Sequence, residues 1–311
     1  MTRSVLFYRH FDQYSGGQQK VFDYFSHLRG QDNFRANISF SGSSLQDETN
    51  PWFPDYQGVH FAPDRYDYLF LAGMDWMLYR QYGIDSNKPV INLIQHVRHA
   101  IPDEDVHPFL SNKAIRICVS TEVETAISPF ANGPTVTIAN GISIPELTCP
   151  KVWDVYIAGY KNQSLASELC HLIGGKVECQ TDFMPRDQLL NNLAASRIVV
   201  VLPHLTEGFF LPALEAMKTA DVTIVPDCVG NRSFCFDAVQ DPDRGNCLIP
   251  SYDLDGLASA VVSARELLND SDRLNTLKRN ALNTVNEHSL AREKTQFLDL
   301  MTNVDELWHG L

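Results

Sequence analysis

Two glutamates with a glycine and a proline between them are the residues whose types and spacing most suggest chemistry. Glu207 and Glu215 flank Gly208 and Pro212, just after an apolar run and at the start of a helical pattern. Gly208 permits a tight turn, and Pro212 suits the first turn of a helix, where its missing N–H would have no partner. The backbone N–H groups of residues 208–211 are therefore predicted to form an anion site at the helix N-terminus.

Carboxylates beside an anion site would repel a bare phosphate. Glu207 and Glu215 are therefore better explained as acceptors for the hydroxyl groups of a sugar. The alternative is that both carboxylates only favour the helix N-terminus through its dipole, with no ligand involved. The residues themselves leave these two explanations open.

Metal and disulfide chemistry find little support in the sequence. His96 and His99 are three residues apart and could meet on a helix, but no acidic or cysteine partner lies beside them. The seven cysteines are odd in number and include no Cys-x-x-Cys pair and no spacing typical of zinc. We therefore predict no metal site and reduced cysteines.

Regular elements must position these residues, and the chain alternates short apolar runs with segments of helical period, which predicts parallel α/β units. The elements expected in the first half are strands at 5–8, 68–72, 90–94 and 115–120 and a helix at 18–29. The second half is expected to contain strands at 154–158, 176–179, 198–202 and 222–225, helices at 164–173, 186–195 and 212–219, and further helices from 253 onwards. The helix at 18–29 has an apolar face, which favours packing on a sheet over binding to a membrane.

The stretch 145–150 has two prolines and no periodicity, and it is the best linker candidate. We therefore predict an α/β protein with two doubly wound, Rossmann-like domains, residues 1–148 and 149–311, that face each other across a cleft. Whether the last helix packs on the N-terminal domain is left open. Because ligands of doubly wound sheets bind at the carboxyl ends of the strands, the loops that follow strands should carry the site.

Charge and hydropathy exclude several classes of partner. The chain has 311 residues and a formal net charge of −13, which disfavours nucleic acid because such affinity comes from clustered lysine and arginine. No stretch approaches the roughly 20 apolar residues that cross a bilayer, and the first apolar run is too short for a signal peptide. We expect a cytoplasmic protein, with peripheral association at the inner face of a membrane left open, and the oligomeric state is not indicated.

The segment around the two glutamates resembles the signature of the retaining GT-B glycosyltransferases of family 4, the glycosyl transferases group 1. That signature is approximately Glu-Gly-Phe-Gly-Leu-Pro-x-x-Glu-Ala-Met, and residues 207–217 are EGFFLPALEAM. Phe210 replaces the second glycine, and every other fixed position matches. Residues 15–17, 119–122 and 138–142 resemble further segments of the family in the same order along the chain.

The resemblance implies a role for each candidate. Glu207 would bond the hydroxyls of the transferred sugar, and Glu215 would bond the ribose hydroxyls of the nucleotide. The intervening backbone would lie near the diphosphate, at Gly208, Phe209, Phe210 and Leu211. The glycine loop, Gly16 and Gly17, would let the backbone approach the donor phosphate and the acceptor, and Met184 belongs to a loop that would cup the base.

Two further side chains carry charge in this scheme. His96 would bond the donor sugar and steady developing charge, and Lys161 would neutralise the diphosphate. The family has an arginine beside this lysine, and only the lysine is present here. Because a lost electrostatic donor can cost about 3 kcal/mol, either Arg186 or Arg232 compensates or turnover is weak.

The sequence thus predicts a glycosyltransferase that moves a sugar from a nucleotide-sugar donor to a glycan, a lipid-linked acceptor or a small molecule. By resemblance the transfer would be retaining, and it would need neither a metal nor a resident cofactor, since Lys161 and helix N–H groups would stabilise the leaving group. The alternative is a nucleotide-sugar-binding subunit or scaffold with weak or no catalysis. A dinucleotide oxidoreductase is disfavoured because no Gly-x-Gly-x-x-Gly follows a strand.

Overall fold

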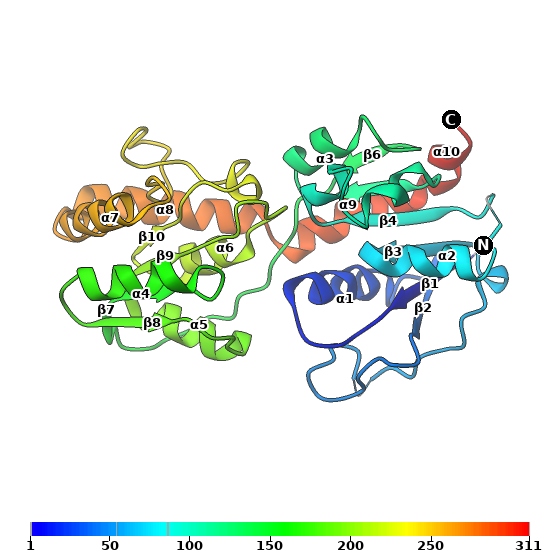
Figure 1. Ribbon diagram of the computed structural model, residues 1–311, viewed down its shortest axis with the longest axis horizontal. Coiled ribbons are helices and arrows are strands. Elements are labelled where there is room, and N and C mark those ends of the chain that lie inside the picture. The colour runs from blue at the N-terminus through cyan, green and yellow to red at the C-terminus, as the bar shows by residue number, and fades with distance from the viewer. Residues whose placement is uncertain (1, 54, 86, 311) are drawn as a thin grey trace. The chain divides into compact units, whose positions relative to one another are not determined.

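The computed structural model describes residues 2–53, 55–85 and 87–310, and the chain divides into two compact units (Figure 1). The first unit contains Met1–Gly141 and Leu290–Leu311, and the second contains Ile142–Ser289. The sequence predicts one domain boundary, between residues 148 and 149. In the structure the chain enters the second unit at residue 142 and returns to the first after residue 289.

The stretch expected to be a linker begins inside the second unit. The carbonyl oxygen of Ser143 accepts a hydrogen bond from the Arg186 guanidinium at 2.8 Å, and the Glu146 carboxylate pairs with Lys218 at 2.7 Å. These contacts attach the segment to the second unit before its second proline. At the other end of the chain, the helices drawn in red belong to the first unit (Figure 1).

The first unit is built on a sheet of six parallel strands in the order β2-β1-β3-β4-β5-β6. The strands are β1 (Arg3–Arg9), β2 (Phe34–Phe40), β3 (Tyr68–Ala72), β4 (Val90–Ile94), β5 (Ile115–Cys118) and β6 (Thr135–Thr137). The direction of winding changes between β1 and β3. In doubly wound sheets this switch point, at the carboxyl ends of the strands, is where ligands bind.

Helices pack on both faces of this sheet, because successive strand residues point to opposite faces. On one face, Phe7 and Phe70 stack with ring centroids 4.4 Å apart, and Phe297 packs edge-on against Phe70. On the other face, Leu6 belongs to a buried cluster with Trp76. The helices of this unit are α1 (Gly16–Leu28), α2 (Trp76–Gln81), α3 (Thr121–Ile127), α9 (Leu290–Thr302) and α10 (Val304–His309).

The second unit is built on a sheet of four parallel strands in the order β10-β9-β7-β8, so its switch point lies between β7 and β9. The strands are β7 (Trp153–Ala158), β8 (Val177–Gln180), β9 (Ser196–Val201) and β10 (Val222–Ile224). The helices are α4 (Gln163–Leu172), α5 (Arg186–Ala194), α6 (Leu211–Thr219), α7 (Leu254–Leu267) and α8 (Ser271–Glu287). Strand residues such as Val155 and Ile198 pack with Leu169 of α4 and Val261 of α7 in one core.

The prediction of an α/β fold with two doubly wound parallel sheets is confirmed. Within the described ranges, none of the helices combines the length and the apolar character that a membrane crossing requires.

Candidate functional site

A lysine and a glutamate meet at the switch point of the second sheet. Lys161 lies on the connection that follows β7, and Glu207 lies on the connection that follows β9. The Lys161 ammonium forms an ion pair with Oε1 of Glu207 and lies 5.2 Å from the centroid of the Phe210 ring. The side chain of Lys161 remains 35% exposed, so its positive charge stays accessible to a ligand at the edge of the sheet.

Glu215 is buried on α6, the helix that follows the Glu207 loop, and it has its own cation. Only 4% of Glu215 is exposed, and its Oε1 accepts a hydrogen bond from Nε of Arg186 at 2.8 Å. Burial raises the pKa of Glu215, and the neighbouring guanidinium opposes this rise without cancelling it. Arg186 also donates to the carbonyl of Ser143, so both ends of its guanidinium are engaged within the unit.

The backbone N–H groups before α6 are partly used by the protein itself. The N–H of Phe210 donates to the Gly230 carbonyl at 3.0 Å, and that of Leu211 donates to the Phe209 carbonyl at 3.2 Å. The structure therefore differs from the open anion site predicted for residues 208–211. The cause is a close approach by the loop at Gly230, where a Cβ atom would lie 2.8 Å from the Phe209 nitrogen.

This close approach makes glycine necessary at position 230 and shifts the electrostatic task to a side chain. With two of the expected N–H donors occupied, the partly exposed ammonium of Lys161, which is paired with Glu207, offers positive charge at the switch point of this sheet. Arg232, the second arginine considered as a compensating cation, forms an ion pair with Asp227 at 2.6 Å. Both arginines proposed as compensators thus have carboxylate partners in the structure.

The other residues of the second unit that were predicted to bind the nucleotide sugar lie on the same edge of the sheet. The Met184 sulfur accepts a hydrogen bond from the side-chain amide of Asn192 at 3.4 Å, on the connection between β8 and α5. The ring of Phe209 is buried and stacks on Phe234 with centroids 4.9 Å apart. Phe209 can therefore offer a ligand its backbone but not its ring, and Gly208 is buried beside it.

Gly16, Gly17 and His96 lie in the first unit, at the carboxyl ends of β1 and β4. Ser15 caps α1 by accepting a hydrogen bond from the Gln18 N–H at 3.2 Å. Nδ1 of His96 accepts a hydrogen bond from the N–H of Arg98 at 3.3 Å. Within the described residues, no group of three or more histidine, cysteine or acidic side chains is arranged to hold a metal ion.

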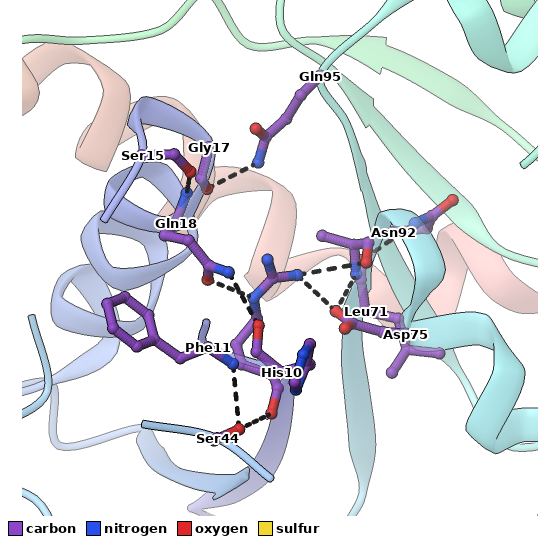
Figure 2. Close-up of polar contacts among 12 residues, drawn as sticks. His10, Phe11, Ser15, Gly17, Gln18, Ser44, Leu71, Asp75, Asn92 and Gln95 are labelled. Atoms are coloured by element: carbon purple, nitrogen blue, oxygen red, sulfur yellow. Dashed lines mark hydrogen bonds and ion pairs between the residues drawn. The ribbon is translucent and has the colours of Figure 1, made fainter. Parts of the chain in front are cut away.

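A buried ion pair at the switch point of the first sheet was not found from the sequence. Arg9 ends β1, and its Nη1 lies 2.8 Å from the Asp75 carboxylate while its Nε donates to Gln18 at 3.0 Å. Figure 2 shows Gln18 and Asp75 converging on this guanidinium between the strand ends. Burial raises the pKa of Asp75, and Arg9 opposes the rise. The sequence did contain a signal for this ion pair, because Arg9 is a charged residue at the end of an apolar strand that leads into the glycine loop.

The two glycines of the loop, Gly16 and Gly17, differ in their surroundings, and we predict that substitution by alanine affects stability more at one than at the other. A Cβ atom at Gly17 would lie 2.7 Å from Oε1 of Gln95, whose amide donates to the Gly17 carbonyl at 3.1 Å (Figure 2). At Gly16, by contrast, a Cβ atom would meet no other atom within 4 Å. Gly17→Ala displaces Gln95 and is expected to be about 1 kcal/mol less stable than Gly16→Ala. Comparing the two alanines cancels the helix-propensity gain, and equal melting temperatures would contradict the prediction.

Residues 142–267 match the family described as Glycosyl transferases group 1. No curated protein matches the chain in sequence. Among solved structures, the chain resembles a sucrose-phosphate synthase from Thermosynechococcus elongatus, with a TM-score of 0.70, 13% identity, and coverage of 98% of this chain and 99% of that one.

Two other solved structures have similar values. HepE from Anabaena, in complex with UDP-glucose, gives a TM-score of 0.68 and 13% identity over 97% of this chain and 100% of that one. A glycosyltransferase from Rickettsia africae gives a TM-score of 0.68 and 13% identity over 98% and 99%. The predicted enzyme class, a glycosyltransferase, is confirmed: the chain has the GT-B fold, and residues 142–267 match the model of the glycosyl transferases group 1.

Proposed function

We propose that the protein transfers a sugar from a nucleotide-sugar donor to an acceptor hydroxyl, as a retaining enzyme of family 4 that needs no metal ion. The observation that carries the proposal is the Lys161–Glu207 pair at the switch point of the second sheet, in the same unit as the buried Glu215. The group 1 family match over this unit supports it. The UDP-glucose complex of HepE supports a nucleotide sugar as the donor class.

The chemistry divides between the two carboxylates and the lysine. The bond between the anomeric carbon and the diphosphate breaks, and Lys161 stabilises the negative charge that develops on the leaving oxygen. Glu207 accepts hydrogen bonds from hydroxyls of the sugar, and Glu215 accepts them from the ribose. The acceptor hydroxyl attacks from the face of the leaving group, and its proton passes to the departing diphosphate. No resident cofactor takes part in this scheme.

The donor site is positioned before the ligand arrives. Glu207 holds the Lys161 ammonium from one side and the Phe210 ring supports it from another, so little reorganisation is needed when the diphosphate binds. In the first unit we keep Gly16, Gly17 and His96 as proposed ligand-binding residues. All three lie at the carboxyl edge of their sheet.

Thermal unfolding with UDP, GDP, ADP and CMP, and with NAD as the control, tests the donor proposal. A ligand at about 100 times its dissociation constant stabilises the protein by about 2.7 kcal/mol. We expect one nucleotide to raise the melting temperature of the wild type and of Glu146→Ala. The same nucleotide should leave the melting temperature of Glu215→Ala unchanged. Glu146 is a suitable control because, like Glu215, it is a carboxylate of the second unit that pairs with a basic side chain, in this case Lys218. No shift with any nucleotide would reject the donor site.

A nucleotide-sugar-binding subunit without catalysis is the second candidate. The observation that favours it is that the chain lacks the arginine that the family has beside this lysine, and that Arg186 and Arg232, like Lys161, already have carboxylate partners. The two candidates differ in one measurable property. Donor hydrolysis or sugar transfer above background rejects the binding subunit, whereas nucleotide binding without either reaction supports it.

A further inference from the structure

Two large aromatic side chains, Tyr160 and Phe183, are exposed next to each other in the second unit. Tyr160 follows β7 and Phe183 follows β8, so both lie at the carboxyl edge of the sheet. Tyr160 is 47% exposed and Phe183 is 59% exposed, and their ring centroids lie 6.1 Å apart at an interplanar angle of 72°. The fold gains little from aromatic surface left in water, and neighbouring exposed rings are typical of a binding surface.

The backbone just before Phe183 is held by two side-chain amides. The amide of Gln163, the first residue of α4, donates to the Thr181 carbonyl at 2.8 Å. The amide of Gln180, the last residue of β8, donates to the Asp182 carbonyl at 2.9 Å. These hydrogen bonds fix the loop before a ligand binds, so stacking on the ring does not require a loose segment to become ordered.

The cation of the proposed donor site lies on the same edge of the sheet as these rings. Tyr160 precedes Lys161 in the chain, and the Lys161 ammonium is held by Glu207 at the switch point. A flat aromatic surface beside an accessible cation suits a ligand in which a flat ring is joined to phosphates. A neutral sugar would use the aromatic surface alone, and a free phosphate would use the cation alone.

We propose that Tyr160 and Phe183 form the stacking surface for the base of a nucleoside diphosphate whose phosphates reach Lys161. This inference rests on the proposed function and adds the side chains that bind the base. Because the rings are inclined at 72°, a base that stacks on one ring meets the edge of the other. Phe183, the more exposed ring, presents its face to the base, and Tyr160 contacts the base from its edge.

Isothermal titration calorimetry with UDP, GDP, ADP and CMP tests this assignment. For the nucleotide that binds the wild type, Phe183→Leu and Tyr160→Leu are each expected to weaken binding about 5- to 100-fold, the range for loss of one stacked base. Phe183→Trp should retain the affinity and report binding by quenching of its fluorescence. Phe236→Leu is the control, since Phe236 is another exposed aromatic residue of this unit and packs instead on Arg244.

Inorganic pyrophosphate separates the base from the phosphates. Its affinity should be unchanged in Phe183→Leu and reduced in Lys161→Met. If the wild type binds no nucleotide, the proposed function fails. If the wild type binds a nucleotide and neither leucine variant changes its affinity more than twofold, or Phe236→Leu weakens it equally, the stacking surface is rejected and the proposed function stands.

Discussion

Replacing Glu293 with leucine is expected to lower the free energy of unfolding of the first unit by about 3–5 kcal/mol, the usual cost of removing one partner from a buried ion pair. Glu293 on α9 is 1% exposed, and its carboxylate lies 2.6 Å from the Lys20 ammonium and 2.8 Å from Nε2 of His27. It also accepts a hydrogen bond from the N–H of Gly141 at 2.6 Å. The leucine leaves the buried Lys20 ammonium with Asp23 as its one carboxylate partner among the described residues.

Urea unfolding monitored by tryptophan fluorescence measures this effect. Trp52, Trp76 and Trp308 are buried in the first unit, so their emission reports its unfolding. Glu306→Leu is the matched control, because Glu306 is an exposed glutamate of α10 in the same unit. A loss below about 1 kcal/mol in Glu293→Leu, or an equal loss in the control, would contradict the importance of this cluster.

The stabilisation by Glu293 should depend on pH with a defined sign. Burial raises its pKa, but His27, Lys20 and the Gly141 N–H together outweigh burial, and the net pKa is lowered from 4.5. Such a carboxylate stabilises the fold above its unfolded pKa and loses that stabilisation as pH falls through the folded value. The difference in the free energy of unfolding between the wild type and Glu293→Leu should therefore become smaller below about pH 4.5.

Lys161→Met is expected to lower the rate of donor cleavage about 100- to 1,000-fold, the usual effect of removing one electrostatic donor from a leaving group. The methionine retains the length of the side chain and its packing on Phe210 while it removes the charge. Because Lys161 is 35% exposed, its pair with Glu207 adds little to stability, and the melting temperature should change little.

Lys176→Met is the matched control for this variant. Lys176 also belongs to the second unit and also lies over an aromatic ring, 5.4 Å from the centroid of Trp153. It precedes β8, however, and so lies at the amino edge of the sheet, away from the switch point. A rate in Lys161→Met within threefold of the wild type would show that this lysine does not stabilise the leaving group.

The central strands could be predicted from the sequence because, apart from Asn92, they are continuous apolar runs. The strands at 68–72 and 90–94 have the predicted bounds, and every residue in them is buried. The edge strands β2 and β6 were not assigned. β2 includes Arg35 and Asn37 in a half-exposed pattern, and β6 has only three residues, so neither shows a continuous apolar run. Strand pairing defines them, and pairing is not visible in the local pattern.

The candidate site was predictable in its residue types and less so in its pairings. The loop that carries Glu207 and the loop that carries Lys161 were both found from local patterns, and parallel strands bring their ends to one edge. The Arg186–Glu215 pair and the use of the Phe210 N–H by Gly230 depend on contacts between segments distant in sequence. A helical pattern also does not tell which unit a helix packs on, so the place of residues 290–311 came only from the structure.

Release of nucleoside diphosphate from a panel of UDP-, GDP- and ADP-sugars is the decisive assay for donor cleavage by this protein. We expect release above the enzyme-free rate from at least one donor, with the activity kept in Lys176→Met and lost about 100-fold or more in Lys161→Met. No release from any donor, or equal release by the wild type and Lys161→Met, would contradict the claim that this chain cleaves a nucleotide sugar at the Lys161–Glu207 pair.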